Sequence, residues 1–298
     1  MSEASSATSP STPLPPLAAT LAKAGAENFP VALGFLPRRL RADLQAIYGF
    51  ARLVDDIGDE LDADRLALLD EVDADLTVLF AGGEPRIPAV AALVDPVRAG
   101  RFPEEPLRKL VEANRMDQRV ARYESFEDLL AYCTLSADPV GRLVLAALGR
   151  ATPELIALSD QVCSGLQIVE HLQDVGEDVR RGRIYLPQAD MAEFGVREAD
   201  LHAAKACPPL RALLAFEAER ARALLDAGIP LTRAIHGRPK IAVAAFAAGG
   251  RAALAAMARV HFDVLQFRCT PRKPRLVGET LAVLLGVRSR PPSTGSRS

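Results

Sequence analysis

The chain has 298 residues, of which 49% are hydrophobic, enough for one large core or two small ones. Lys and Arg number 36 against 38 Asp and Glu, and this balance argues against a nucleic-acid partner. The four cysteines stand far apart, with neither a Cys-x-x-Cys pair nor a nearby histidine in ligand spacing. This arrangement argues against a zinc site and favours a reducing, cytoplasmic location.

Both ends of the chain are predicted to be disordered tails around a single domain. Residues 1–16 are rich in Ser, Thr and Pro and lack the basic start and apolar core of a signal peptide. Residues 287–298 have a similar composition, which leaves 17–286 as the domain. Its longest apolar stretches, 241–250 and 281–287, are too short to span a bilayer.

The region between the tails is predicted to be helical almost throughout. Ala and Leu dominate, Trp is absent, and runs of alternating β-branched residues are lacking. Gly- and Pro-rich breakers separate the segments where a helix bundle needs turns. The predicted helices, in chain order, are 39–60, 64–80, 88–99, 105–119, 126–150, 153–180, 211–227, 240–260 and 278–285. The fold class is therefore all-α.

Two acidic motifs interrupt this pattern, each near the C-terminal end of a long and otherwise apolar predicted helix. Asp55 and Asp59 lie four residues apart, as do Asp174 and Asp178, and this spacing puts each pair on one helical face. Either pair alone is most simply interpreted as a solvated surface. Two such pairs on core-like helices instead need a compensating cation, and Mg²⁺ with a phosphate group is the expected one.

Basic residues stand close to both motifs. Arg52 lies three residues before Asp55, and Arg180, Arg181, Arg183 and Tyr185 follow the second motif. A guanidinium group donates two parallel hydrogen bonds and therefore suits phosphate oxygens. For Arg180 and Arg181, ordinary charge at a helix C-terminus is an equally good explanation. Arg183 lies beyond that helix end, so this alternative explains it less well.

These residues resemble the squalene/phytoene synthase family, whose members act on isoprenoid diphosphates. The resemblance covers most of the chain in the family's order. Four stretches carry it: Asn28-Phe29-Pro30-Val31-Ala32 with Leu36-Pro37-Arg38-Arg39-Leu40; Ala46 to Arg52 running into Asp55-Asp56-Ile57-Gly58-Asp59-Glu60; Tyr132-Cys133 through Pro139-Val140-Gly141; and Gln167 to Pro187, with Gln173-Asp174-Val175-Gly176-Glu177-Asp178. It implies an isoprenoid-synthase-type bundle with a central apolar cavity.

The resemblance also assigns residue roles. Two or three Mg²⁺ ions are expected on the four motif aspartates, and the diphosphate is expected on Arg52, Arg183, Tyr185 and Asn28. Tyr48, Tyr132 and Gln167 match cavity positions, although buried packing explains Tyr132 equally well. Glu170 stands where most of the family has Asn, and there it would add a metal ligand or a base. His171, next to the second motif, is interpreted as a packing or surface residue.

The branch most like this sequence is the bacterial hydroxysqualene synthases of hopanoid biosynthesis. That resemblance implies conversion of presqualene diphosphate to hydroxysqualene without NADPH, alongside a presqualene diphosphate synthase and a flavin-dependent reductase. The alternatives are a phytoene or dehydrosqualene synthase, which joins two prenyl diphosphates, and a non-catalytic helical scaffold. A di-iron bundle is excluded, because no Glu has a His three residues later.

The C-terminal part combines a basic segment, 268–275, with the apolar segment 281–287. A final amphipathic helix that docks on the bundle is the favoured interpretation. The alternative is that this part rests on an anionic membrane surface.

Overall fold

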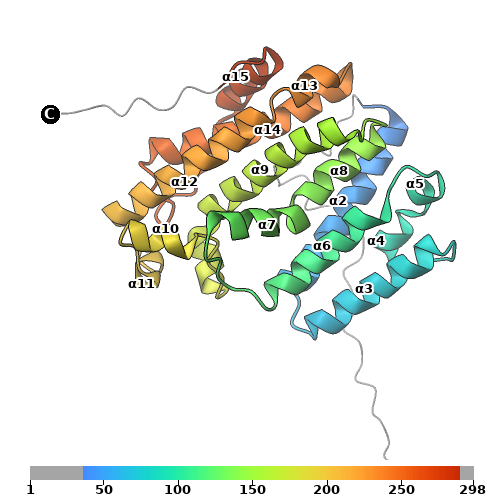
Figure 1. Ribbon diagram of the computed structural model, residues 1–298, viewed down its shortest axis with the longest axis horizontal. Coiled ribbons are helices and arrows are strands. Elements are labelled where there is room, and N and C mark those ends of the chain that lie inside the picture. The colour runs from blue at the N-terminus through green and yellow to red at the C-terminus, as the bar shows by residue number, and fades with distance from the viewer. Residues whose placement is uncertain (1–35, 289–298) are drawn as a thin grey trace, which may run out of the picture.

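A computed structural model describes residues 36–288, and within them the secondary structure is helical apart from one isolated bridge between Arg122 and Ile184. Figure 1 shows the bundle, in which α14, α9, α8 and α6 lie side by side. The helices are α2 (Arg38–Asp59), α3 (Arg65–Phe80), α4 (Pro88–Ala91), α5 (Val94–Arg98), α6 (Glu104–Asp117), α7 (Phe126–Ser136), α8 (Asp138–Ala147), α9 (Pro153–Arg180), α10 (Gln188–Glu193), α11 (Glu198–Leu201), α12 (Pro208–Ala227), α13 (Leu231–Ala234), α14 (Arg238–Arg259) and α15 (Lys273–Leu284).

The all-α prediction is confirmed, but part of it lies outside the described residues. Asn28 and the predicted tail at 1–16 are among those outside, as are all but two residues of the predicted tail at 287–298. The single-domain boundaries therefore stay a prediction.

The central helix α9 has the bounds that the sequence predicts, because both of its ends carry local signals. At its start the Thr152 hydroxyl accepts from the Leu155 backbone N–H, and Pro153 occupies the first turn. Beyond its end Gly182 adopts a φ of 82°, a conformation that costs glycine little. The 28-residue helix packs against α8, α12 and α14.

Two predicted helices are each broken in two. The segment 126–150 forms α7 and α8, with the break at Ala137 just before Asp138-Pro139. Proline lacks an N–H and disfavours helical backbone in the residue before it, so it begins a new helix instead of continuing one. The segment 88–99 similarly forms α4 and α5. The short helices α10, α11 and α13 were not predicted.

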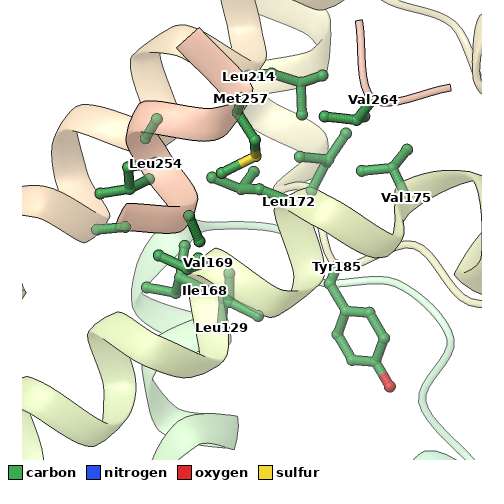
Figure 2. Packing of buried hydrophobic residues seen from close by; sticks show 14 of the residues in the cluster. Leu129, Ile168, Val169, Leu172, Val175, Tyr185, Leu214, Leu254, Met257 and Val264 are labelled. Atoms are coloured by element: carbon green, nitrogen blue, oxygen red, sulfur yellow. The ribbon is translucent and has the colours of Figure 1, made fainter. Parts of the chain in front are cut away.

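The core consists of two main clusters of buried side chains. One surrounds α9, α12 and α14, and Figure 2 shows Ile168, Val169 and Leu172 of α9 packed near Leu254 and Met257 of α14. The other joins α2, α3, α6 and α8. Tyr132 belongs to the first cluster and Ile57 to the second. Each cluster carries one acidic motif, since Val54 and Ile57 of the second cluster flank the first motif and Val175 and Val179 of the first cluster flank the second motif.

Two described segments, Phe126–Ala147 and Arg238–Arg259, are long and apolar enough by composition to cross a membrane. The first is interrupted at Ala137, and 56% and 67% of their apolar windows are buried inside the bundle. Both therefore have the character of core helices.

The C-terminal helix docks on the bundle, as the favoured interpretation predicts. α15 packs along α14, Val283 is fully buried, and Glu279 Oε2 lies 3.4 Å from Arg251 Nε of α14.

Candidate active site

The first acidic motif occupies the last turns of α2. Arg52 Nε lies 2.7 Å from Asp56 Oδ1, and Arg52 Nη2 lies 2.5 Å from Glu60 Oε1. Asp56 is buried, so this ion pair satisfies a charge that would otherwise be costly. Arg52 is thus placed beside the motif, as predicted, but pairs with its second and last acids.

Asp55 combines an accessible side chain with a strongly perturbed carboxyl group. It accepts a hydrogen bond of 3.2 Å from Asn114 Nδ2 of α6. Burial raises its pKa to about 7, and the charges of Asp59 and Asp117 act in the same direction. Binding of a cation there would favour the charged form.

The second motif lies in the last two turns of α9, between the buried residues Leu172, Val175 and Val179. Asp174 is exposed and Asp178 half-buried, with His171 Nδ1 3.9 Å from Asp178 Oδ2. Burial raises the pKa of Asp174, and the charges of Asp178 and Glu177 add to that shift. Like the first motif, the second concentrates negative charge that a cation would relieve.

Two arginines directly after α9 connect the motifs. Arg183 Nη1 lies 2.5 Å from Asp59 Oδ1, and its other terminal nitrogen donates to the Gly58 carbonyl at 3.3 Å. Arg181 lies 2.8 Å from Glu177 of the second motif and 3.6 Å from Asp59 of the first. The Arg183 backbone N–H also donates to the Asp178 carbonyl. The two motifs, 119 positions apart in sequence between Asp55 and Asp174, therefore border one site.

Beside the motifs, three of the chain's four tyrosines form an aromatic cluster with His171. The Tyr185 ring stacks on the His171 ring with centroids 3.7 Å apart. The hydroxyls of Tyr132 and Tyr185 both donate to Asp117, at 2.6 and 3.0 Å. In Figure 2 the Tyr185 hydroxyl points away from the apolar side chains. The cluster thus fixes the direction of two hydroxyl groups.

The remaining predicted residues lie on the same two helices. Tyr48 is buried on α2, two turns before Asp55. Gln167 Nε2 lies 3.2 Å from His171 Nε2, so this amide has the partner that a half-buried polar group needs. Glu170 is exposed on α9. Their roles in catalysis stay predictions.

A model of the squalene/phytoene synthases matches residues 22–275 of the sequence. The chain belongs to the squalene/phytoene synthase family. Hydroxysqualene synthase of Rhodopseudomonas palustris is 39% identical over 213 residues, covering 70% of this chain and 71% of the relative. Phytoene synthase of Arthrospira platensis is 36% identical over 214 residues, covering 66% and 68%.

Solved structures of this family share the fold. Squalene synthase HpnC of Alicyclobacillus acidocaldarius has a TM-score of 0.75 and 42% identity, covering 82% of this chain and 92% of that one. A dehydrosqualene synthase crystallised with a ligand has a TM-score of 0.80 and 26% identity, covering 90% and 94%. The predicted isoprenoid-synthase-type fold is thereby confirmed. A central apolar cavity stays a prediction.

Three residues at this site, Asn114, Asp117 and Tyr123, were not predicted from the sequence, although part of the signal was present. Asn114 and Asp117 fall on the stripe of α6 that Leu107, Leu110 and Val111 line at helical spacing, so they are polar residues at core positions. Tyr123 belongs to the cluster but carries no motif. His171 packs, as predicted, yet its stacking partner is a predicted site residue.

The donor set fits a magnesium ion, which family members of this type are expected to hold. Carboxylate oxygens are the ligands that this ion prefers. Burial raises the pKa values of Asp55 and Asp174, and the negative charges of neighbouring acids raise them further. Within residues 36–288, no three carboxylate, histidine or cysteine groups gather closely enough to form a complete metal site. Each motif would offer a pair of ligands to such an ion, and substrate oxygens and water would complete the coordination.

Proposed function

We propose that the chain converts presqualene diphosphate and water into hydroxysqualene and diphosphate. In this reaction the carbon–oxygen bond to the diphosphate breaks, and the leaving group departs with the electron pair. The cyclopropylcarbinyl cation that remains rearranges to an allylic cation. Water then adds to that cation and loses a proton, so atoms and charge balance without a reductant. NADPH is accordingly not part of the proposal.

The observation that carries the proposal is the bridge from Asp59 through Arg181 and Arg183 to the end of α9. It brings guanidinium donors and both acidic motifs to one place, as recognition of a diphosphate requires. Magnesium held by Asp55, Asp59, Asp174 and Asp178 would neutralise charge that develops on the leaving diphosphate. Arg183 and Arg181 would exchange part of their contact with Asp59 for phosphate oxygens.

The other predicted site residues would serve either the carbocation or the leaving diphosphate. Tyr132 and Tyr185, held by Asp117, would present ring faces and fixed hydroxyls to the substrate. Gln167, oriented by His171, and Tyr48 would border the same space. Glu170 would act as a metal ligand or as a base. Arg52 and Tyr185 would contact the diphosphate, as would Asn28, which lies outside the described residues. Apolar walls would delay the attack of water.

Relatives named hydroxysqualene synthase, 35–39% identical, support this choice of reaction. The second candidate is condensation of two prenyl diphosphates. It is supported by relatives named phytoene synthase at 35–37% identity and by the dehydrosqualene synthase structure. Under the first candidate, a presqualene diphosphate synthase would supply the substrate and a flavin-dependent reductase would consume the product, all in the cytoplasm.

Product identification separates the candidates. The purified chain is incubated with Mg²⁺, without NADPH, and separately with presqualene, farnesyl and geranylgeranyl diphosphates, and the extracted lipids are analysed by mass spectrometry. Hydroxysqualene from presqualene diphosphate is the expected result. Phytoene from geranylgeranyl diphosphate, or dehydrosqualene from farnesyl diphosphate, would contradict the first candidate and support the second, condensation of two prenyl diphosphates. No turnover of any substrate would favour the scaffold alternative.

A further inference from the structure

The C-terminal helix α15 has two unlike faces. The inner face docks on α14 through buried Val283 and through Glu279, which pairs with Arg251. Arg251 Nη1 also donates to the Val287 carbonyl at 3.0 Å, which ties down the chain just beyond the helix. The helix is therefore held in one orientation.

The outer face of α15 is apolar. Val277, Leu281 and Leu285 are 60%, 56% and 79% exposed. Their spacing of four residues places them in one stripe along the helix. A helix that only covers a core is expected to present polar residues to solvent, and Phe267 and Val287 add further exposed apolar surface at 46% and 50%. The stripe therefore needs a partner.

The surrounding chain is strongly basic. Residues 266–288 contain five Lys and Arg residues and one acid, Glu279, a net charge of +4 in a protein whose total is −2. That one acid faces inward and also pairs with Arg275 at 2.6 Å. Arg268, Arg272 and Lys273 are exposed. Exposed cations beside an apolar stripe match the headgroups and acyl boundary of an anionic bilayer.

The basic segment also borders the active site. Gln173 Nε2, one residue before the second motif, donates to the Cys269 carbonyl at 2.6 Å. Leu265 lies against Gly176 within that motif. A surface that contacted these cations would therefore lie close to the second acidic motif.

We propose that the outer face of α15, together with the exposed cations of 268–273, docks this protein on an anionic membrane surface. A second copy fits less well, because a symmetric contact would place two segments of charge +4 against each other. Residues 289–298 add two arginines and no large apolar side chain, so their composition does not suit them to cover the stripe. Membrane docking does not depend on which isoprenoid reaction the chain performs.

Vesicle co-sedimentation of the full chain tests the proposal. The probes are phosphatidylcholine vesicles with and without phosphatidylglycerol, and three variants are compared with the wild type. Leu281→Ser with Leu285→Ser removes apolar surface, Arg272→Gln with Lys273→Gln removes charge, and Val78→Ser is the control. Val78 is likewise an apolar residue that is 41% exposed, but it lies on α3, away from α15 (Figure 1).

The wild type and Val78→Ser are expected to bind anionic vesicles equally, and both double variants about tenfold more weakly. Turnover of substrate dispersed in detergent should remain within about twofold in all variants, since the substituted residues lie outside the active site. Equal binding of all four proteins, or no binding of the wild type, would overturn the proposal. So would light scattering that shows a wild-type dimer which the Leu281→Ser/Leu285→Ser variant loses, because the stripe's partner would then be a second copy.

Discussion

Asp117 is the acceptor that two site tyrosines share. Burial raises its pKa, while hydrogen bonds from Tyr132 and Tyr185 and the charge of Arg183 oppose that rise. Removing one partner from such a buried network leaves others unsatisfied. We therefore interpret Asp117 as a residue that positions both hydroxyls and, through Arg183, the bridge to Asp59.

Asp117→Asn is expected to lower kcat roughly 10- to 100-fold, because an amide has one carbonyl acceptor where the carboxylate has two oxygens. Steady-state kinetics and thermal unfolding of the variant are the measurements. A second variant, Tyr132→Phe, tests the network: combined with Asp117→Asn it should add less than its separate effect. If the two losses multiply in full, or if kcat stays within twofold, Asp117 does not act through the tyrosines.

The sequence predicts the motif residues better than it predicts the residues that position them. Asp55 and Asp174 belong to local patterns, so spacing alone identifies them. Asp117 and Tyr123 reach the site only because α6 packs against α2 and because the loop after α6 hydrogen-bonds to the segment that follows α9. Such contacts between distant segments leave little trace in one sequence. The exception is a polar residue on an apolar stripe, and Asn114 shows that this signal was available.

At the scale of elements, α2 and α6 approach each other closely at Gly58. A Cβ atom added there would lie 2.1 Å from Asn114 Oδ1 and 3.1 Å from its Cγ. Asn114 is buried and donates to both Asp55 and the Leu110 carbonyl, so it cannot rotate without losing these bonds. Glycine at 58 thus allows α6 to orient a carboxylate on α2.

Gly58→Ala is expected to lower the free energy of unfolding by about 1–2 kcal/mol, because lost hydrogen bonds and strain outweigh the better helix propensity of alanine. Because Asn114 would shift away from Asp55, kcat should also fall about tenfold. Chemical denaturation and kinetics measure the two effects. Gly249→Ala, in α14 with nothing within 4 Å of the added Cβ, is the control and should be neutral or stabilising. Equal behaviour of the two variants would contradict this account.

Helix α12 carries a buried acid whose protonation couples stability to pH. Burial, followed by the neighbouring Asp190, raises the pKa of Glu217 to about 8 against an ordinary value of 4.5, and Arg220 at 3.1 Å opposes the shift. The folded state therefore keeps a proton that the unfolded state releases. This contribution to stability is complete below about pH 4.5 and is lost as pH rises through about 8.

Glu217→Gln should remove that dependence, since the amide is neutral at every pH and keeps an acceptor for Arg220. The variant is expected to be more stable than the wild type by roughly 2–4 kcal/mol above pH 8, with the difference shrinking as pH falls towards 5. Urea unfolding at a series of pH values measures it. Glu219→Gln, an exposed position on the same helix, should show no such trend. A difference that grows as pH falls would refute the sign of the shift.

Helix ends were predictable where capping signals are local and unpredictable where a break depends on packing. Thr152-Pro153 and Gly182 define α9 in the sequence itself. The apolar pattern of 126–150 continues across Ala137, although Pro139 begins a second helix there. The periodicity of apolar residues indicates which face of a helix is buried, but it does not indicate where the helix axis changes direction.

Over the whole molecule, each of the two apolar clusters supports one acidic motif, and the two motifs border one site. The cluster around α9 fixes the second motif, and the cluster around α2 fixes the first. Arg181 and Arg183 close the gap between them. If both motifs act on the same diphosphate, the loss of either should disable the other.

Diphosphate release by single and double motif variants tests this claim most directly. With presqualene diphosphate and Mg²⁺, Asp55→Asn and Asp174→Asn should each fold normally and lose at least about 100-fold in rate. The double variant should be scarcely slower than either single variant, because the motifs work as one unit. Asp62→Asn, in the exposed turn after α2, should retain wild-type activity. Full turnover by either single variant, or losses that multiply in the double variant, would contradict a shared site.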